Sequence, residues 1–127
     1  MSKISNTEEE YIKVISSLQD KNGRVRTTDV ANKLGVRPSS VTEMLKRLER
    51  KRLIIYRPYH GSILTEQGRK IANLLNTRYE IIKNFLQHIG VKSGIAEVDA
   101  CNIEHIISPE SINQMKKVVE KKLFEVR

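Results

Sequence analysis

The sequence has 127 residues, of which 39% are hydrophobic, so it can fold as one compact domain or as two small domains that share an interface. No apolar run approaches the ~18–20 residues needed to cross a bilayer, and the acidic N-terminus lacks the apolar core of a signal peptide. The single cysteine excludes an internal disulfide. We therefore expect a soluble, cytoplasmic protein that has no membrane partner.

The net charge of +8 is concentrated in one third of the chain. Residues 21–60 contain eleven Lys or Arg and three Asp or Glu, whereas residues 1–20 have a net charge of −2 and residues 61–127 one of +2. A basic segment of this kind favours a polyanionic partner, and nucleic acid is favoured over a membrane surface. On charge alone, the alternative is a basic surface that only improves solubility.

The pattern of apolar residues predicts two helices at the start of the chain. The first is capped by Asn6 or Thr7, has three glutamates in its first turn, and buries one apolar stripe until it stops at residues 21–23. The second is short, follows a capping signal at residues 27–29, and ends at Gly35.

A third helix and a β-hairpin follow. The helix starts at Ser39, after a turn formed by residues 35–38, and places apolar residues inward and basic residues outward. Residues 53–57 are rich in β-branched and aromatic side chains, and the chain turns and returns through residues 62–64, which is typical of a short two-stranded hairpin.

Only helices are predicted after the hairpin. A long helix of roughly two dozen residues runs from Thr65 to Gly90, and helices at about 95–107 and from residues 108–110 onward follow it. The apolar stripe of the long helix indicates a link between two subdomains and a face for a partner subunit. The predicted fold class is mainly α with a small β-hairpin wing: a winged helix-turn-helix domain followed by an α-helical dimerisation domain.

The basic segment is predicted to bind double-stranded DNA. In a winged helix-turn-helix, short polar side chains at the start of the second helix can reach base edges in the major groove, and arginines can contact phosphates or guanine. The scarcity of aromatic residues disfavours single strands and RNA. For a single residue such as Ser39, a helix-capping role is the alternative. The predicted DNA-contact residues are Thr27, Arg37, Pro38, Ser39, Ser40, Thr42, Arg47, Arg50 and Arg57.

Three potential metal ligands lie close together on the predicted fifth helix. The spacing of Cys101, Glu104 and His105 places them on one face, with Glu97 one turn earlier. Thiolate, carboxylate and imidazole suit Fe(II), Co(II), Ni(II) or Zn(II), and not Ca(II) or Mg(II). The alternative is a core cysteine beside a surface Glu-His pair. A hydrolase in which His105 activates Cys101 is a remote alternative, because side chains one turn apart poorly surround a substrate.

These segments together resemble the diphtheria toxin repressor family of metal-dependent transcription regulators, which has iron-type and manganese-type members. The resemblance extends over nearly the whole chain and is strongest in residues 7–12, 37–42, 64–68 and 101–108.

The resemblance implies a domain organisation. Residues 1–72 would form the winged-helix DNA-binding domain, and residues 73–127 the helical dimerisation and metal-binding domain. Iron-type members continue into a small β-barrel domain where this chain ends, so the chain resembles the short, manganese-type form.

The resemblance also implies a ligand set. Cys101, Glu104 and His105 match the fifth-helix ligands of iron-type members, and the first-helix ligand falls on Glu10. Glu97 occupies a position where iron-type members have a ligand histidine, and it is a possible further ligand.

The second metal site of the family is missing its ligands in this sequence. Its positions fall on Lys13, Tyr79 and Lys83, which implies one metal ion per subunit. The thiol of Cys101 argues against a protein that is selective for manganese, because Mn(II) prefers oxygen and nitrogen ligands. Fe(II) is therefore the favoured ion, and Mn(II), Zn(II), Co(II) or Ni(II) are alternatives.

The resulting hypothesis is a metal-dependent repressor of metal-homeostasis genes that binds a near-palindromic DNA operator as a homodimer. A metal ion that joins Glu10 to the fifth-helix ligands would select one orientation of the two recognition helices, and DNA would tighten metal binding in return. Two alternatives remain open: a winged-helix regulator that no longer responds to metal, and one that senses a small organic ligand.

Overall fold

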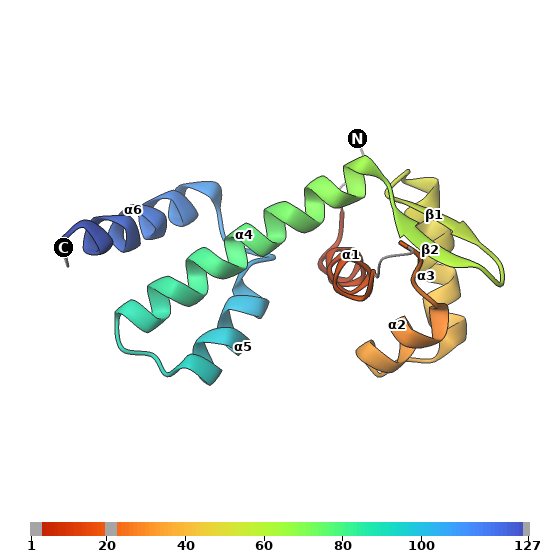
Figure 1. The fold of residues 1–127 in the computed structure, drawn as a ribbon, viewed down its shortest axis with the longest axis horizontal. Coiled ribbons are helices and arrows are strands. Elements are labelled where there is room, and N and C mark those ends of the chain that lie inside the picture. Colours follow the sequence, from red (N-terminus) through yellow and green to blue (C-terminus); the bar gives the residue numbers. More distant parts are fainter. Residues whose placement is uncertain (1–3, 20–22, 126–127) are drawn as a thin grey trace. The chain divides into compact units, whose positions relative to one another are not determined.

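In the computed structural model, which describes residues 4–19 and 23–125, the chain forms two compact units, Met1–Asn73 and Leu74–Arg127 (Figure 1). The elements, in chain order, are α1 (Asn6–Leu18), α2 (Thr27–Leu34), α3 (Pro38–Arg50), β1 (Ile54–Arg57), β2 (Gly61–Leu64), α4 (Glu66–His88), α5 (Ser93–Ile103) and α6 (Pro109–Glu125). The predicted fold class is confirmed. Within the described residues, every helix is too short or too polar to span a bilayer.

The cap of α1 differs from the prediction. Ser5 is the cap: its hydroxyl accepts a hydrogen bond from the Glu8 N–H at 3.1 Å, and the Glu8 carboxylate accepts one from the Ser5 N–H at 2.8 Å. The prediction of Asn6 or Thr7 as the cap is therefore wrong, because both lie inside the first turn. The predicted stop at residues 21–23 falls largely outside the described residues.

Neither helix of the helix-turn-helix begins with the side-chain cap that the sequence predicts. Arg26 precedes α2 without a capping side chain, and residues 27–29 already belong to the helix. Gly35 ends α2 in the left-handed conformation, with φ +68°. Pro38 begins α3, since proline is favoured at the first helical position, so Ser39 lies within the helix and is not its cap.

The hairpin extends the helix-turn-helix into a winged helix. β1 and β2 pair antiparallel, with Ile54 opposite Leu64, and β1 follows α3 directly (Figure 1). Val25, just before α2, forms a β-bridge with Ser62 through hydrogen bonds of 2.8 and 2.9 Å. Gly61 permits this close approach, because a Cβ there would lie 2.4 Å from the Val25 carbonyl oxygen.

The first unit has a continuous apolar core. The inward stripe predicted for the third helix is confirmed, since Val41, Leu45 and Leu48 of α3 are fully buried. Ile12 and Ile15 of α1 are buried in the same core. The core therefore fixes α1, α3 and the hairpin relative to one another within this unit.

The second unit has a smaller core. It is built around Ile82 of α4, Ala100 of α5 and Ile112 of α6. The apolar stripe predicted for the long helix is only partly buried, because Leu74 and Ile89 are 53% and 59% exposed.

The fifth helix ends earlier than predicted. Its last residue is Ile103, and Glu104 is the C-terminal cap. The Ile103 carbonyl accepts the N–H groups of Ile106 and Ile107 at 3.0 Å, which closes the helix in a tight turn. The chain turns here because Pro109 begins α6, and proline fits only the first turn of a helix.

Candidate DNA-binding and metal-binding residues

The first turns of α3 present polar side chains to solvent. Arg37, Pro38, Ser39 and Ser40 are all exposed, as expected for a surface that reaches base edges. Thr42 is half-buried, and its hydroxyl donates to the Pro38 carbonyl at 3.1 Å, so the Thr42 side chain is turned back onto its own helix.

The rest of α3 adds basic side chains to the same unit. Arg47 and Arg50 both line a hollow of about 480 Å³. Its lining residues are Ser40, Glu43, Met44, Lys46, Arg47 and Arg50. Thr27, which is also a predicted DNA-contact residue, is in contrast half-buried at the start of α2.

The hairpin contains Arg57, a predicted DNA-contact residue, and Tyr59, an exposed residue that the sequence did not indicate. The Arg57 guanidinium lies 3.3 Å from the Glu49 carboxylate, and the same group donates to the Tyr56 carbonyl at 3.0 Å. Tyr59, at the turn, is fully exposed and has a φ of +68°. The positive φ is unusual for tyrosine, because its Cβ crowds the backbone there.

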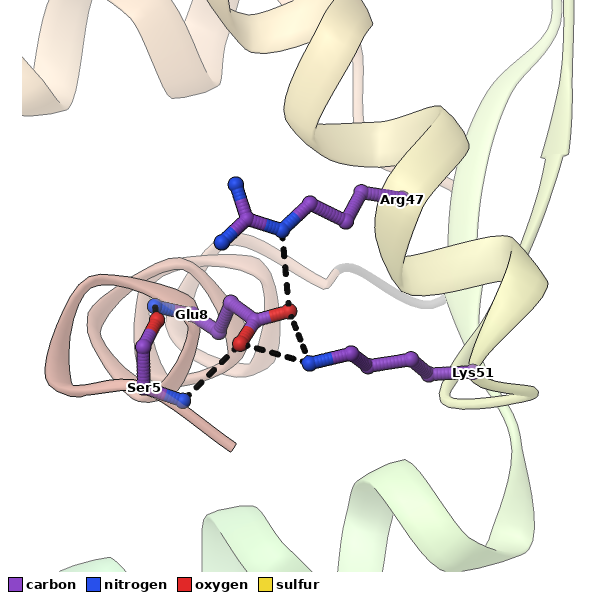
Figure 2. A network of polar contacts seen from close by, with 4 residues as sticks. All are labelled: Ser5, Glu8, Arg47 and Lys51. Carbon is purple, nitrogen blue, oxygen red and sulfur yellow. Dashed lines mark hydrogen bonds and ion pairs between the residues drawn. The ribbon is translucent and has the colours of Figure 1, made fainter. Parts of the chain in front are cut away.

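A buried carboxylate links α1 to α3, which sequence reasoning also missed (Figure 2). Glu8 is 1% exposed, and its carboxylate oxygens lie 2.8 Å from the Lys51 Nζ and 3.5 Å from the Arg47 Nε. Burial raises the pKa of Glu8, but the hydrogen bonds from Lys51 and Ser5 outweigh it and hold that pKa below its ordinary value. The Ser-x-x-Glu motif indicates the capping box, but no sequence pattern indicates the partners from α3 and the residue after it.

Two of the predicted metal ligands come together in the second unit. The side chains of Glu104 and His105 are 0% and 8% exposed, and the His105 Nε2 lies 3.5 Å from a Glu104 carboxylate oxygen. The Arg78 guanidinium donates to the Glu104 backbone carbonyl at 3.4 Å. Buried oxygen and nitrogen donors side by side match the chemistry of a divalent transition-metal ligand pair.

The other predicted ligands do not complete a cluster in the structure. Cys101 is half-buried on α5, and Glu10 is half-buried on α1 in the first unit. Across residues 4–19 and 23–125, no group of three or more His, Cys, Asp or Glu side chains is arranged to hold a metal ion. The donor types present nevertheless fit iron, zinc, cobalt or nickel.

An ammonium group occupies the region to which the resemblance assigns a second metal site. The Lys83 Nζ lies 3.2 Å from the Glu80 carboxylate and 5.4 Å from the centre of the Tyr79 ring. The hydrogen bond to Glu80 raises the pKa of Lys83, and the nearby charge of Glu97 adds to the effect. Glu97 in turn accepts a hydrogen bond from the Ser93 hydroxyl at 3.4 Å.

The fold and the basic face of α3 define a winged-helix DNA-binding protein with an additional helical unit. Residues 3–62 match the model for the N-terminal DNA binding domain of the iron dependent repressors, and residues 65–123 match the model for their metal binding and dimerisation domain. The chain belongs to the iron-dependent repressor family, which confirms the resemblance stated from the sequence. Members of this family are transcriptional regulators and not enzymes, so the hydrolase alternative is not retained.

Solved structures show the same architecture. The hypothetical protein SSo2273 from Sulfolobus solfataricus is 26% identical, with a TM-score of 0.74 over 92% of this chain and 90% of that one. ScaR with bound Zn²⁺ is also 26% identical, with a TM-score of 0.75 over 89% of this chain and 53% of ScaR. A manganese-dependent transcriptional repressor complex with manganese reaches a TM-score of 0.79 at 23% identity, over 89% and 52% of the two chains. This chain thus spans about half the length of the last two.

Proposed function

We propose that the protein is a repressor that binds duplex DNA as a homodimer and responds to a divalent metal ion. The observation that carries this proposal is the exposed, polar and basic face of α3 within a winged helix. The match to a metal binding and dimerisation domain over residues 65–123 supports the metal response and the dimer. Its proposed targets are metal-homeostasis genes, and its proposed location is the cytoplasm.

The proposed DNA interface centres on α3. Ser39 and Ser40 would reach base edges in the major groove, because they are exposed in the first turn of the helix. Arg47 and Arg50, further along α3, would contact phosphates, and Arg57 would do so from the hairpin. Because a two-fold dimer presents two copies of α3 about one turn of DNA apart, we expect a near-palindromic operator.

The proposed ligands are Glu10, Cys101, Glu104 and His105. The adjacency of the buried Glu104 and His105 side chains supports the second-unit part of this set, and the family resemblance supports Glu10. A bound cation would supply positive charge that offsets the repulsion between the glutamates of the set. A metal ion that strengthens DNA binding would itself be bound more tightly in the DNA complex, by the same factor, because the two binding equilibria are linked.

We infer that one ion binds per subunit and that Fe(II) is favoured. Lys83 already supplies a positive charge beside Glu80, in the region of the family's second site. The thiol of Cys101 is a soft ligand, which favours iron, zinc, cobalt or nickel over manganese. ScaR binds Zn²⁺ and Cd²⁺ in two of the similar structures, which supports a divalent ion in general.

The second candidate function is a winged-helix regulator that ignores metal. The observation that favours it is the ammonium group of Lys83, which lies 5.4 Å from the centre of the Tyr79 ring, where the resemblance assigns metal ligands.

DNA binding by the metal-stripped protein tests both candidates. Binding to its own promoter DNA would be measured without oxygen, at fixed salt, with and without Fe(II), Mn(II), Zn(II), Co(II) or Ni(II). A large gain in affinity with one or two ions, lost in Cys101→Ser but kept in the exposed control Asn102→Ala, is the result expected for the repressor. Tight, sequence-specific binding that no ion changes would favour the second candidate.

A further inference from the structure

The Arg47 side chain forms an ion pair with the buried carboxylate of Glu8. Its Nε lies 3.5 Å from Glu8, while half of the Arg47 side chain remains exposed. Figure 2 shows the Arg47 Nε facing the Glu8 carboxylate, with the two Nη atoms on the other side of the guanidinium carbon. A guanidinium has five N–H donors, so one contact through Nε leaves the four Nη donors available.

Arg47 is not the only partner of the buried Glu8 carboxylate. The Lys51 Nζ lies 2.8 Å from both carboxylate oxygens, and the Ser5 N–H donates at 2.8 Å. The Lys51 side chain is only 21% exposed, whereas that of Arg47 is 50% exposed. Lys51 therefore pairs with the carboxylate inside the unit, and the more exposed Arg47 forms an ion pair with it from the surface.

We propose that Glu8 is a positioning residue that pre-orients the Arg47 guanidinium for a DNA phosphate. This inference rests on the proposed function. An arginine that is already ordered loses less side-chain entropy when it binds, and this loss corresponds to about a two- to tenfold change in affinity. Glu8 itself is held in position because α1 is anchored to the core by Ile12 and Ile15, which are fully buried.

Glu8→Gln is a suitable test because it isolates the charge. Glutamine is accepted at this position of a capping box, so the start of α1 is retained. If Glu8 acted only as a negative charge near DNA, its removal would strengthen DNA binding, because phosphates repel carboxylates. If Glu8 positions Arg47, the same substitution weakens DNA binding.

The experiment compares the full chain with Glu8→Gln, Arg47→Ala and the double variant, by fluorescence anisotropy on promoter DNA. We expect Arg47→Ala to lower affinity and to reduce the slope of log affinity against log salt by about 0.9, as for one lost phosphate contact. Glu8→Gln should lower affinity about two- to tenfold in the wild-type background and have no effect in the Arg47→Ala background.

Ser5→Ala is the matched control. It removes the hydroxyl that caps α1 but leaves the Glu8 carboxylate and Arg47 in place. We expect lower stability with DNA affinity unchanged. Equal weakening by Glu8→Gln in both backgrounds, or tighter binding, would overturn the positioning role. If Arg47→Ala itself changes neither affinity nor salt slope, the assignment of Arg47 to the DNA interface fails instead.

Discussion

Replacing Gly61 by alanine should separate the hairpin from α2 and weaken DNA binding. Gly61 has a φ of +91°, and an alanine Cβ would lie 2.4 Å from the Val25 carbonyl oxygen. That oxygen accepts the Ser62 N–H at 2.9 Å, and the Val25 N–H donates to the Ser62 carbonyl at 2.8 Å. The backbone must therefore move, and both hydrogen bonds lengthen or break. Because Arg57 pairs with Gly61 in the hairpin, the same movement displaces a predicted DNA contact.

The size of the effect follows from these contacts. A positive φ costs alanine about 1–2 kcal/mol, and each weakened backbone hydrogen bond costs about 1 kcal/mol. We expect a loss of about 3–4 kcal/mol in unfolding free energy, a large share of the ~5–15 kcal/mol typical of small domains. Gly35→Ala is the matched control, because Gly35 has a φ of +68° but nothing within 4 Å of an added Cβ. It should cost only the about 1–2 kcal/mol of the positive φ.

Urea denaturation followed by circular dichroism would measure both losses, and hydrogen exchange would locate them. The amides of Val25 and Ser62 should lose protection in Gly61→Ala and keep it in Gly35→Ala. DNA affinity should fall in the first variant. Similar stability losses in the two variants would show that the close contact with Val25 does not constrain the hairpin, and the reasoning would be refuted.

Three further predictions follow from other residues. The pKa of Glu8 lies below its ordinary value of 4.5, so the stability it contributes is complete above that pH and is lost as pH falls through the folded-state value. Acid titration of unfolding should therefore show wild type and Glu8→Gln converging below about pH 4.5; a constant difference contradicts this. Glu10→Ala should abolish most of the gain in DNA affinity caused by metal while leaving metal-free binding nearly intact, and equal loss of both would exclude Glu10 as a ligand. Tyr59→Gly should raise unfolding free energy by up to about 1 kcal/mol in urea titrations, because glycine adopts positive φ without strain; a loss of stability would show that the exposed ring makes a contact.

Periodicity was enough to predict the elements that carry the fold. The spacing of Val41, Leu45 and Leu48 places them on one helical face, and all three are buried. Leu74 and Ile89 have the same apolar character but remain exposed. Periodicity identifies an apolar face, but it does not specify what covers that face.

The candidate site was less predictable, because it depends on how elements end and meet. The spacing of Cys101 and His105 suggests one helical face, but α5 stops at Ile103 and the chain turns before the proline of α6. The contact between Glu8 and Lys51 joins residues 43 positions apart, and no local pattern contains such a pair. Both differences arise from tertiary packing and not from helix propensity.

Lysines serve as the positive partners of two glutamates in this chain. Lys51 neutralises the buried Glu8, and Lys83 neutralises Glu80 with a side chain that reaches the Tyr79 ring. A buried or clustered carboxylate requires a positive partner, because its desolvation is costly, and a lysine can meet that requirement as a metal ion does. Under the proposed function, Glu10 and Glu104 are instead the glutamates that bind the metal ion.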